Sequence, residues 1–130
     1  MNKKSLLAIE RIIVCINELD ILTKNKDKEY FYDSFEMIIL INLLNEIQSN
    51  ITKINNKTKN KYKNIDWKII EKEYDDVFLN VEKAWNLSSF IVKEELLDKL
   101  NKLLEQEIPI YYKKLCNKKH KEFIKEDVYE

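Results

Sequence analysis

A chain of 130 residues with 45% hydrophobic and 35% charged residues has the composition of one globular domain and lies far from that of a disordered segment. Its 23 basic and 23 acidic residues cancel, so no overall field draws it to nucleic acid, and Arg11 is the only arginine among 22 lysines. The absence of glycine excludes glycine-rich phosphate loops, the dinucleotide-binding turn and the usual tight hairpins.

The N-terminal segment and the cysteines indicate a cytoplasmic protein. Glu10 and Arg11 interrupt the first apolar segment, where a signal peptide would need an unbroken apolar run. The longest apolar run, from Met37 to Ile41, is far shorter than the roughly 20 residues of a membrane span, so we expect no membrane association. Two cysteines are too few for a disulfide framework, and we expect both as free thiols.

Apolar spacing predicts four helices, of which the first two are long. The first covers roughly residues 3–22, where a series starting at Leu6 recurs at intervals of three and four. The second begins near Asp33, whose spacing to Glu36 suits a capping arrangement, and its apolar stripe continues to Ile54.

A break and a third helix are expected next. Residues 55–64 are rich in lysine and asparagine and show no periodicity, which predicts a loop. Asp66 is a plausible N-cap for a third helix whose apolar stripe runs from Trp67 to Trp85. Residues 86–89 are expected to interrupt this helix.

The fourth helix is expected to be capped by Ser88 or Ser89 and to reach Leu115. Pro109, the only proline, lies inside its pattern and should kink or restart it. The lysine-rich segment from Cys116 onward is expected to be a tail that can form a short, frayed fifth helix.

These elements predict an all-α fold, an antiparallel four-helix up-and-down bundle. The bundle is expected to cover residues 1–115, followed by the lysine-rich C-terminal tail at 116–130.

Four blocks of residues carry a family resemblance that spans about residues 6–115. They are, in chain order, Leu19 with Leu22 and Thr23; Ile41 to Glu46, where Asn45 stands in place of a family glycine; Lys61 to Trp67; and Leu97, Leu100 and Leu104 followed by Glu107-Ile108-Pro109. The third is the closest match, to a Lys-Tyr-Pro-x-Ile-Pro-Trp block. Together they resemble the HepT-like branch of the HEPN superfamily, helical toxin components of bacterial toxin–antitoxin pairs.

The resemblance implies a two-fold homodimer with the third helices near its axis, and a nucleotidyltransferase-type antitoxin or a nucleic acid as partner. Family members carry an Arg, a polar residue and then a His on the third helix. In the ungapped register Tyr74 falls on the Arg, Asp75 on the polar residue, and Leu79 or Asn80 on the His. Only Asp75 agrees with the family pattern.

A second register, with about ten extra residues, stays open across residues 80–92. It places Lys83 on the Arg and Ser88 or Ser89 on the His. Lysine supplies a charge, but serine exchanges no proton near neutral pH, so neither register restores the catalytic pair.

We therefore expect a catalytically degenerate HepT-like bundle that acts by binding, as a dimer, in a toxin–antitoxin or related defence system. One alternative is a diverged, metal-independent HEPN ribonuclease that uses Lys83 or Tyr74. The other is a helical adaptor unrelated to this family. The sequence does not decide whether the protein is an enzyme, although it favours a protein without enzymatic activity. It indicates no cofactor.

The remaining candidate sites are weak. Lys59, Lys61 and Lys63, with Tyr62 and Trp67 nearby, could hold phosphates and stack on the bases of RNA. The competing interpretation is a solvated loop with both aromatic rings turned into the core. The only histidine, in the lysine-rich tail, and the two distant cysteines show no metal-ligand spacing, so no metal site is predicted.

Overall fold

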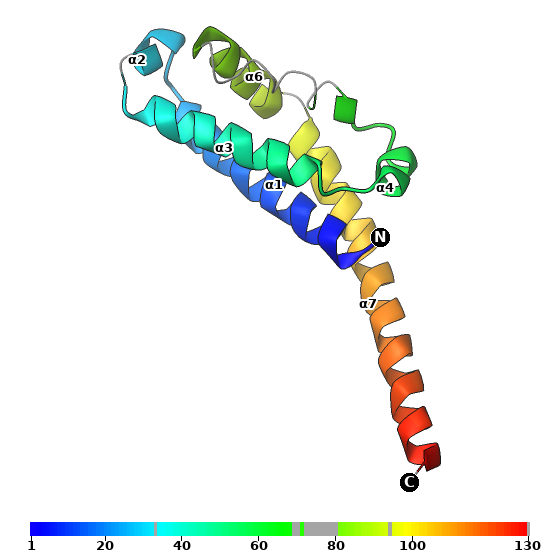
Figure 1. Cartoon of the computed structure of the whole chain (residues 1–130). Coiled ribbons are helices and arrows are strands. Elements are labelled where there is room, and N and C mark those ends of the chain that lie inside the picture. The colour runs from blue at the N-terminus through cyan, green and yellow to red at the C-terminus, as the bar shows by residue number, and fades with distance from the viewer. Residues whose placement is uncertain (33, 69–70, 72–80, 94, 130) are drawn as a thin grey trace.

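The computed structural model of the whole chain describes residues 1–32, 34–68, 71, 81–93 and 95–129, and side chains up to residue 119 except residue 93 (Figure 1). Every regular element in these ranges is an α-helix, which confirms the all-α class. The elements in chain order are α1 (Lys3–Thr23), α2 (Lys28–Tyr32), α3 (Glu36–Ile51), α4 (Asn56–Lys61), α6 (Val81–Lys93) and α7 (Leu96–Tyr129).

Helices α1 and α3 lie side by side in opposite directions and form the centre of the fold (Figure 1). The side chain of Asn2 starts α1 by accepting a hydrogen bond from the backbone N–H of Ser5, at 2.8 Å. Of the predicted apolar series of α1, Leu6, Ile9 and Ile16 are buried and Ile13 is partly buried, and Leu19 extends the buried face by one more turn. Helix α1 also contacts α6 and α7, so one apolar core joins the four longest helices.

Two short helices form in segments whose apolar residues show no helical periodicity. Helix α2 follows a turn in which Asn25 adopts a positive φ of 60°, a conformation that asparagine tolerates in a chain without glycine. Helix α4 occupies part of the predicted loop at 55–64, so that prediction was wrong for residues 56–61. The Asn55 side chain accepts a hydrogen bond from the backbone N–H of Thr58 at 2.9 Å and so caps the start of α4.

Helix α3 begins at Glu36, slightly after the expected start, and ends at Ile51. The Ser34 hydroxyl accepts a hydrogen bond from the Glu36 backbone N–H at 3.1 Å, whereas Asp33 lies outside the described residues. Ile54 is buried although it follows the helix, because the chain turns back toward the core there.

The predicted interruption at residues 86–89 is wrong, because α6 continues through them to Lys93. Ser88 does not cap a helix start. Its buried hydroxyl donates to the carbonyl of Ala84 at 2.8 Å, one turn earlier in the same helix. The last helix consequently begins at Leu96.

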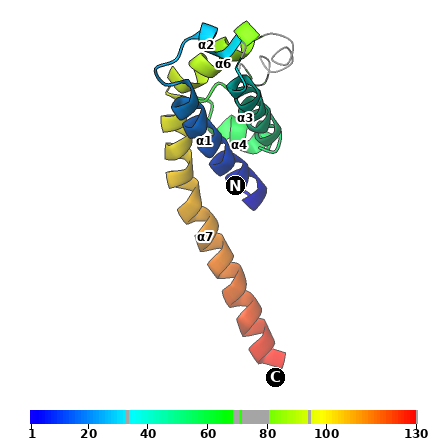
Figure 2. The same ribbon diagram turned by 90° about the vertical axis from the view of Figure 1, so that its left-hand side faces the viewer.

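Helix α7 runs without restarting through Pro109 to Tyr129, and its C-terminal part projects away from the other helices (Figure 2). Proline removes one intrahelical hydrogen bond, to the carbonyl of Glu105, whose side chain is exposed there. Hydrogen bonds on both sides of this position keep the helix continuous. The segment from Cys116 onward is therefore a continuation of α7 and no separate helix.

Most of the predicted third helix falls on residues 69–70 and 72–80, which lie outside the described residues. The positions Tyr74, Asp75 and Asn80 of the degenerate family motif lie there too. At the start of this stretch Trp67 is buried in the core.

Candidate functional site

The block from Lys61 to Trp67 folds as a tight unit at the end of α4. The Trp67 indole N–H donates to the carbonyl oxygen of Tyr62 at 3.1 Å, within the protein interior. Tyr62 is 9% exposed and Trp67 6%, and both belong to the core. Their rings therefore cannot stack on a base, as the competing interpretation of this block held.

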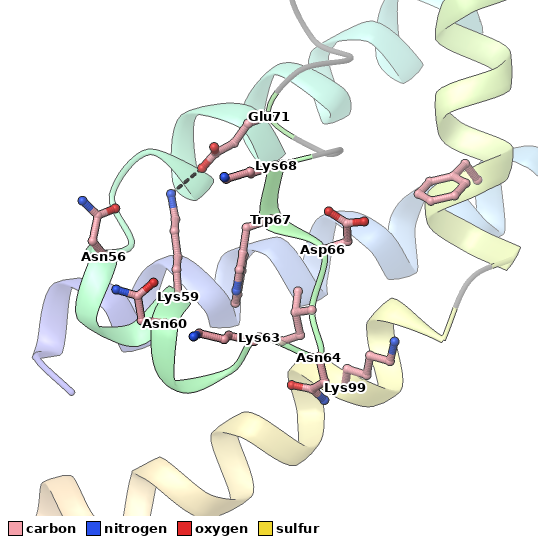
Figure 3. Close-up of a pocket in the computed structure, with 12 residues that line it drawn as sticks. Asn56, Lys59, Asn60, Lys63, Asn64, Asp66, Trp67, Lys68, Glu71 and Lys99 are labelled. Carbon is pink, nitrogen blue, oxygen red and sulfur yellow. Dashed lines mark hydrogen bonds and ion pairs between the residues drawn. The ribbon is translucent and has the colours of Figure 1, made fainter.

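A cavity of about 770 Å³ lies on one side of α4 and of the block that follows it. Lysines and asparagine amides dominate its lining, and they come from α4, the adjoining turn and α7 (Figure 3). The lining residues are Asn56, Lys59, Asn60, Lys63, Asn64, Ile65, Asp66, Trp67, Lys68, Glu71, Phe90 and Lys99. We call this space the lysine cavity.

The lysine cavity carries an excess of positive charge, since four lysines stand against the two carboxylates Asp66 and Glu71. Lys59 is ion-paired with Glu71 (Figure 3). No such pair holds Lys63 or Lys99 within the part of the chain that the structure describes. An anionic group entering the cavity would therefore meet ammonium groups that are not already neutralised.

Phe90 supplies an aromatic ring to the lysine cavity from α6, and the residue is 38% exposed. Sequence reasoning missed this residue, together with Lys68 and Lys99, because three separate segments of the chain bring them to Lys59 and Lys63. Phe90 could have been noticed only as an exposed apolar residue on an amphipathic helix.

Lys61, grouped with Lys59 and Lys63 in the sequence, points to a second and smaller hollow of about 160 Å³. Its ammonium group lies 2.9 Å from Oε1 of Glu107 on α7, a residue that is 2% exposed. The remaining lining residues are Met1, Asn55, Lys57, Thr58, Ile110 and Lys114. We call this space the glutamate hollow.

Glu107 stays ionised in this buried place. Burial acts to raise the pKa of its carboxyl group, but the hydrogen bond from Lys61 and the neighbouring Tyr62 hydroxyl outweigh it, and the pKa is lowered. Burial also raises the pKa of the Tyr62 phenol, and the negative charge of Glu107 adds to this effect. No hydrogen bond of ordinary geometry reaches Oε2 of Glu107 or the Tyr62 hydroxyl in the described part of the chain.

The positions predicted from the second motif register do not form a catalytic pair. Lys83 is exposed on α6 and takes part in an interaction there, whereas Ser88 is buried and bonded to the helix backbone. Over the described residues no group of three or more His, Cys, Asp or Glu side chains could hold a metal ion. The side chain of His120 lies outside the described residues.

Comparison of this chain with protein-family models, with curated proteins and with solved structures found no significant match. Among the described residues, no helix combines the length and apolar character needed to cross a membrane.

Proposed function

We propose that this protein acts by binding single-stranded RNA in the lysine cavity, without cleaving it. The observation that carries the proposal is the convergence of Lys59, Lys63 and Lys99 with an exposed aromatic ring, Phe90, around one open cavity. These are the two elements of single-strand recognition, because ammonium groups hold phosphates and an aromatic face stacks on a base.

The amides of the cavity fit the same ligand. Asn56, Asn60 and Asn64 each offer both a donor and an acceptor, which suit the exposed edges of unpaired bases. The ion pair between Lys59 and Glu71 limits the electrostatic contribution of that lysine. We therefore expect Lys63 and Lys99 to carry most of the phosphate binding.

A binding role without catalysis is favoured by the chemistry that the described residues offer. Cleavage by a HEPN-type site needs an arginine and a histidine close together, yet Arg11 is paired with Glu46 between α1 and α3. Lys83, the charge of the alternative ribonuclease, already takes part in an interaction on α6. The ribonuclease alternative predicts RNA cleavage that Lys83→Ala abolishes.

HepT-like ancestry is part of the proposal and rests on the resemblance. It would make the protein a catalytically degenerate, cytoplasmic member of a toxin–antitoxin or related defence system, with the antiparallel four-helix bundle and homodimer of that family. A nucleotidyltransferase-type antitoxin would be its protein partner. Two of the resembling blocks, Lys61 to Trp67 and Glu107 to Pro109, are in contact through the ion pair between Lys61 and Glu107.

The test is the affinity for a fluorescently labelled single-stranded RNA, measured by anisotropy over a range of salt concentrations. The double variant Lys63→Ala/Lys99→Ala should weaken binding and reduce the salt slope by about 0.7 for each phosphate that the variant no longer neutralises. Lys24→Ala, an exposed lysine at the far end of α1, is the matched control. Equal affinity of the double variant and the control would refute the proposal.

Phe90→Ala separates stacking from charge. It should weaken RNA binding by about 1–3 kcal/mol while leaving the salt slope unchanged, because stacking releases no counterions. Incubation of the wild-type protein with the same RNA tests cleavage directly. Cleavage that Lys83→Ala removes would replace the binding proposal by the ribonuclease.

A further inference from the structure

Six exposed apolar residues lie on the outer side of the pair formed by α1 and α3. They are Leu7, Val14 and Ile21 on α1, and Phe35, Ile38 and Ile39 at the start of α3. Ile21 is 75% exposed and Phe35 77%. Large apolar side chains that gather on a surface in this way mark a site of interaction. We call these six residues the α1–α3 face.

The antiparallel packing of the two helices brings the α1–α3 face together (Figure 1). The ion pair between Arg11 and Glu46 joins α1 to α3 on this side. Val14 follows Arg11 by about one helical turn, and Ile39 precedes Glu46 by about two. Because the helices run in opposite directions, the end of α1 with Ile21 lies beside the start of α3.

Acidic residues border the α1–α3 face. Glu10 and Glu18 are exposed on α1, on either side of the line of its three apolar residues. No ion pair engages either carboxylate within the described residues, and Arg11 on the same helix is already paired with Glu46. The α1–α3 face therefore favours a partner that is apolar at its centre and basic at its flanks.

The part of α7 that projects from the other helices has this complementary character (Figure 2). Its apolar residues recur at the i, i+3, i+4 and i+7 spacing of a helix that docks in a groove: Ile108, Tyr111, Tyr112 and Leu115. Lys114, Lys118 and Lys119 flank this stripe, and no acidic residue occurs from Ile108 to Lys119. We call residues 108–119 the basic arm.

The basic arm does not reach the α1–α3 face of its own chain. Helix α7 is continuous through Pro109 and carries the arm beyond the start of α1 (Figures 1 and 2). A second copy of the chain can bring its arm to the face. At a rise of about 1.5 Å per residue, the arm spans roughly 17 Å and the line from Leu7 to Ile21 roughly 21 Å, so the two lengths match.

We propose that two copies of this chain associate by placing the basic arm of each copy on the α1–α3 face of the other. The apolar stripe of the arm covers side chains such as Ile21 and Phe35, and its lysines approach Glu10 and Glu18. A two-fold pair contains this contact twice, which doubles the apolar area removed from water and closes the assembly.

This dimer differs from the one that the family resemblance implies, in which the third helices lie near the two-fold axis. It also does not depend on RNA binding, because neither the basic arm nor the α1–α3 face shares a residue with the lysine cavity. The proposal and the proposed function can therefore fail independently.

Sedimentation of the whole protein over a range of concentrations tests the association. We expect twice the mass of one chain. Ile108→Lys should raise the dissociation constant of the dimer about tenfold or more, because it places a charge in the apolar stripe. Ile110→Lys is the matched control, since Ile110 is also 39% exposed on α7 but lies off the stripe, and it should dimerise like the wild type.

Three results of this experiment would overturn the proposal. A single-chain mass at every concentration would show that the basic arm has no partner of its own kind. A mass that grows beyond two chains would indicate open-ended association. Equal dissociation constants for Ile108→Lys and Ile110→Lys would show a dimer that is held together elsewhere, as by the third helices.

Reversal of charge tests the contact without changing an apolar residue. Glu10→Lys/Glu18→Lys reverses the border of the face, and Lys118→Glu/Lys119→Glu reverses the flank of the arm. Each double variant alone should dimerise about tenfold more weakly or worse, because both of its contacts bring like charges together. An equimolar mixture of the two should dimerise like the wild type, because both contacts then join opposite charges.

The same variants distinguish the contact between arm and face from a pairing of the two arms with each other. Paired arms would leave Glu10→Lys/Glu18→Lys as tightly dimeric as the wild type. That result, or a mixture that associates no better than its two components, would overturn the proposal.

Discussion

The Nζ atom of Lys61 lies 2.9 Å from Oε1 of Glu107 and joins a side chain that is 56% exposed to one that is 2% exposed. This ion pair ties α4 to α7, two elements that are far apart in the sequence. The same pair connects the block from Lys61 to Trp67 with the segment from Glu107 to Pro109. Both segments are among the four blocks on which the family resemblance was based.

Removal of Lys61 should destabilise the fold more than removal of its neighbour Lys59. Lys61→Ala leaves the buried Glu107 carboxylate without its ion-pair partner, which is costly in a poorly solvated place. Lys59→Ala is the matched control, because its partner Glu71 is 38% exposed and stays hydrated. Urea unfolding should give a lower midpoint for Lys61→Ala, and equal midpoints would contradict the structural role of this pair.

The pH dependence of the unfolding free energy should reflect the ionisation of Glu107. Because the pKa of Glu107 is lowered in the folded protein, its contribution is present above the ordinary glutamate pKa of about 4.3 and is lost as the pH falls below it. The difference in unfolding free energy between the wild type and Glu107→Gln should therefore shrink on acidification. Glu105→Gln, an exposed glutamate on the same helix, gives the baseline. A difference that grows toward acid pH would contradict the direction of this shift.

Long amphipathic helices were predictable from the sequence, and short or abutting ones were not. The bounds of α1 agree with the prediction because apolar residues recur over five turns of it. Helices α2 and α4 contain five and six residues, too few for any period to show. The boundary between α6 and α7 was misplaced, since Ser88 near a break resembles a cap but bonds the carbonyl of Ala84 in the helix interior.

Only part of the candidate site could be predicted from the sequence. Lys59 and Lys63 were proposed together, and both line the lysine cavity. Lys61 was placed in the same group, but α4 presents it to Glu107 on the other hollow. Phe90 reaches the cavity from α6 through tertiary packing, which no local pattern specifies.

The two cysteines should differ sharply in reactivity. Cys15 is fully buried, and burial raises the pKa of its thiol to about 11, with the negative charge of Glu46 adding to the effect. Cys116 is exposed on α7. A thiol reagent at mildly alkaline pH should therefore label Cys116 alone in the native protein and both cysteines in urea. Cys116→Ser should show no fast labelling, and rapid labelling of this variant would contradict the buried position of Cys15.

Replacement of Pro109 should stabilise α7. Proline inside a helix removes a hydrogen bond and costs about 3 kcal/mol relative to alanine, yet α7 remains continuous here. Pro109→Ala restores a donor for the carbonyl of Glu105, so far-UV circular dichroism should show more helix and thermal unfolding should shift upward. Lys113→Ala, at an exposed position in the same helix, controls for the alanine itself. A lower unfolding temperature for Pro109→Ala would contradict this prediction. It would mean that the proline ring stabilises the fold more than the missing hydrogen bond destabilises it.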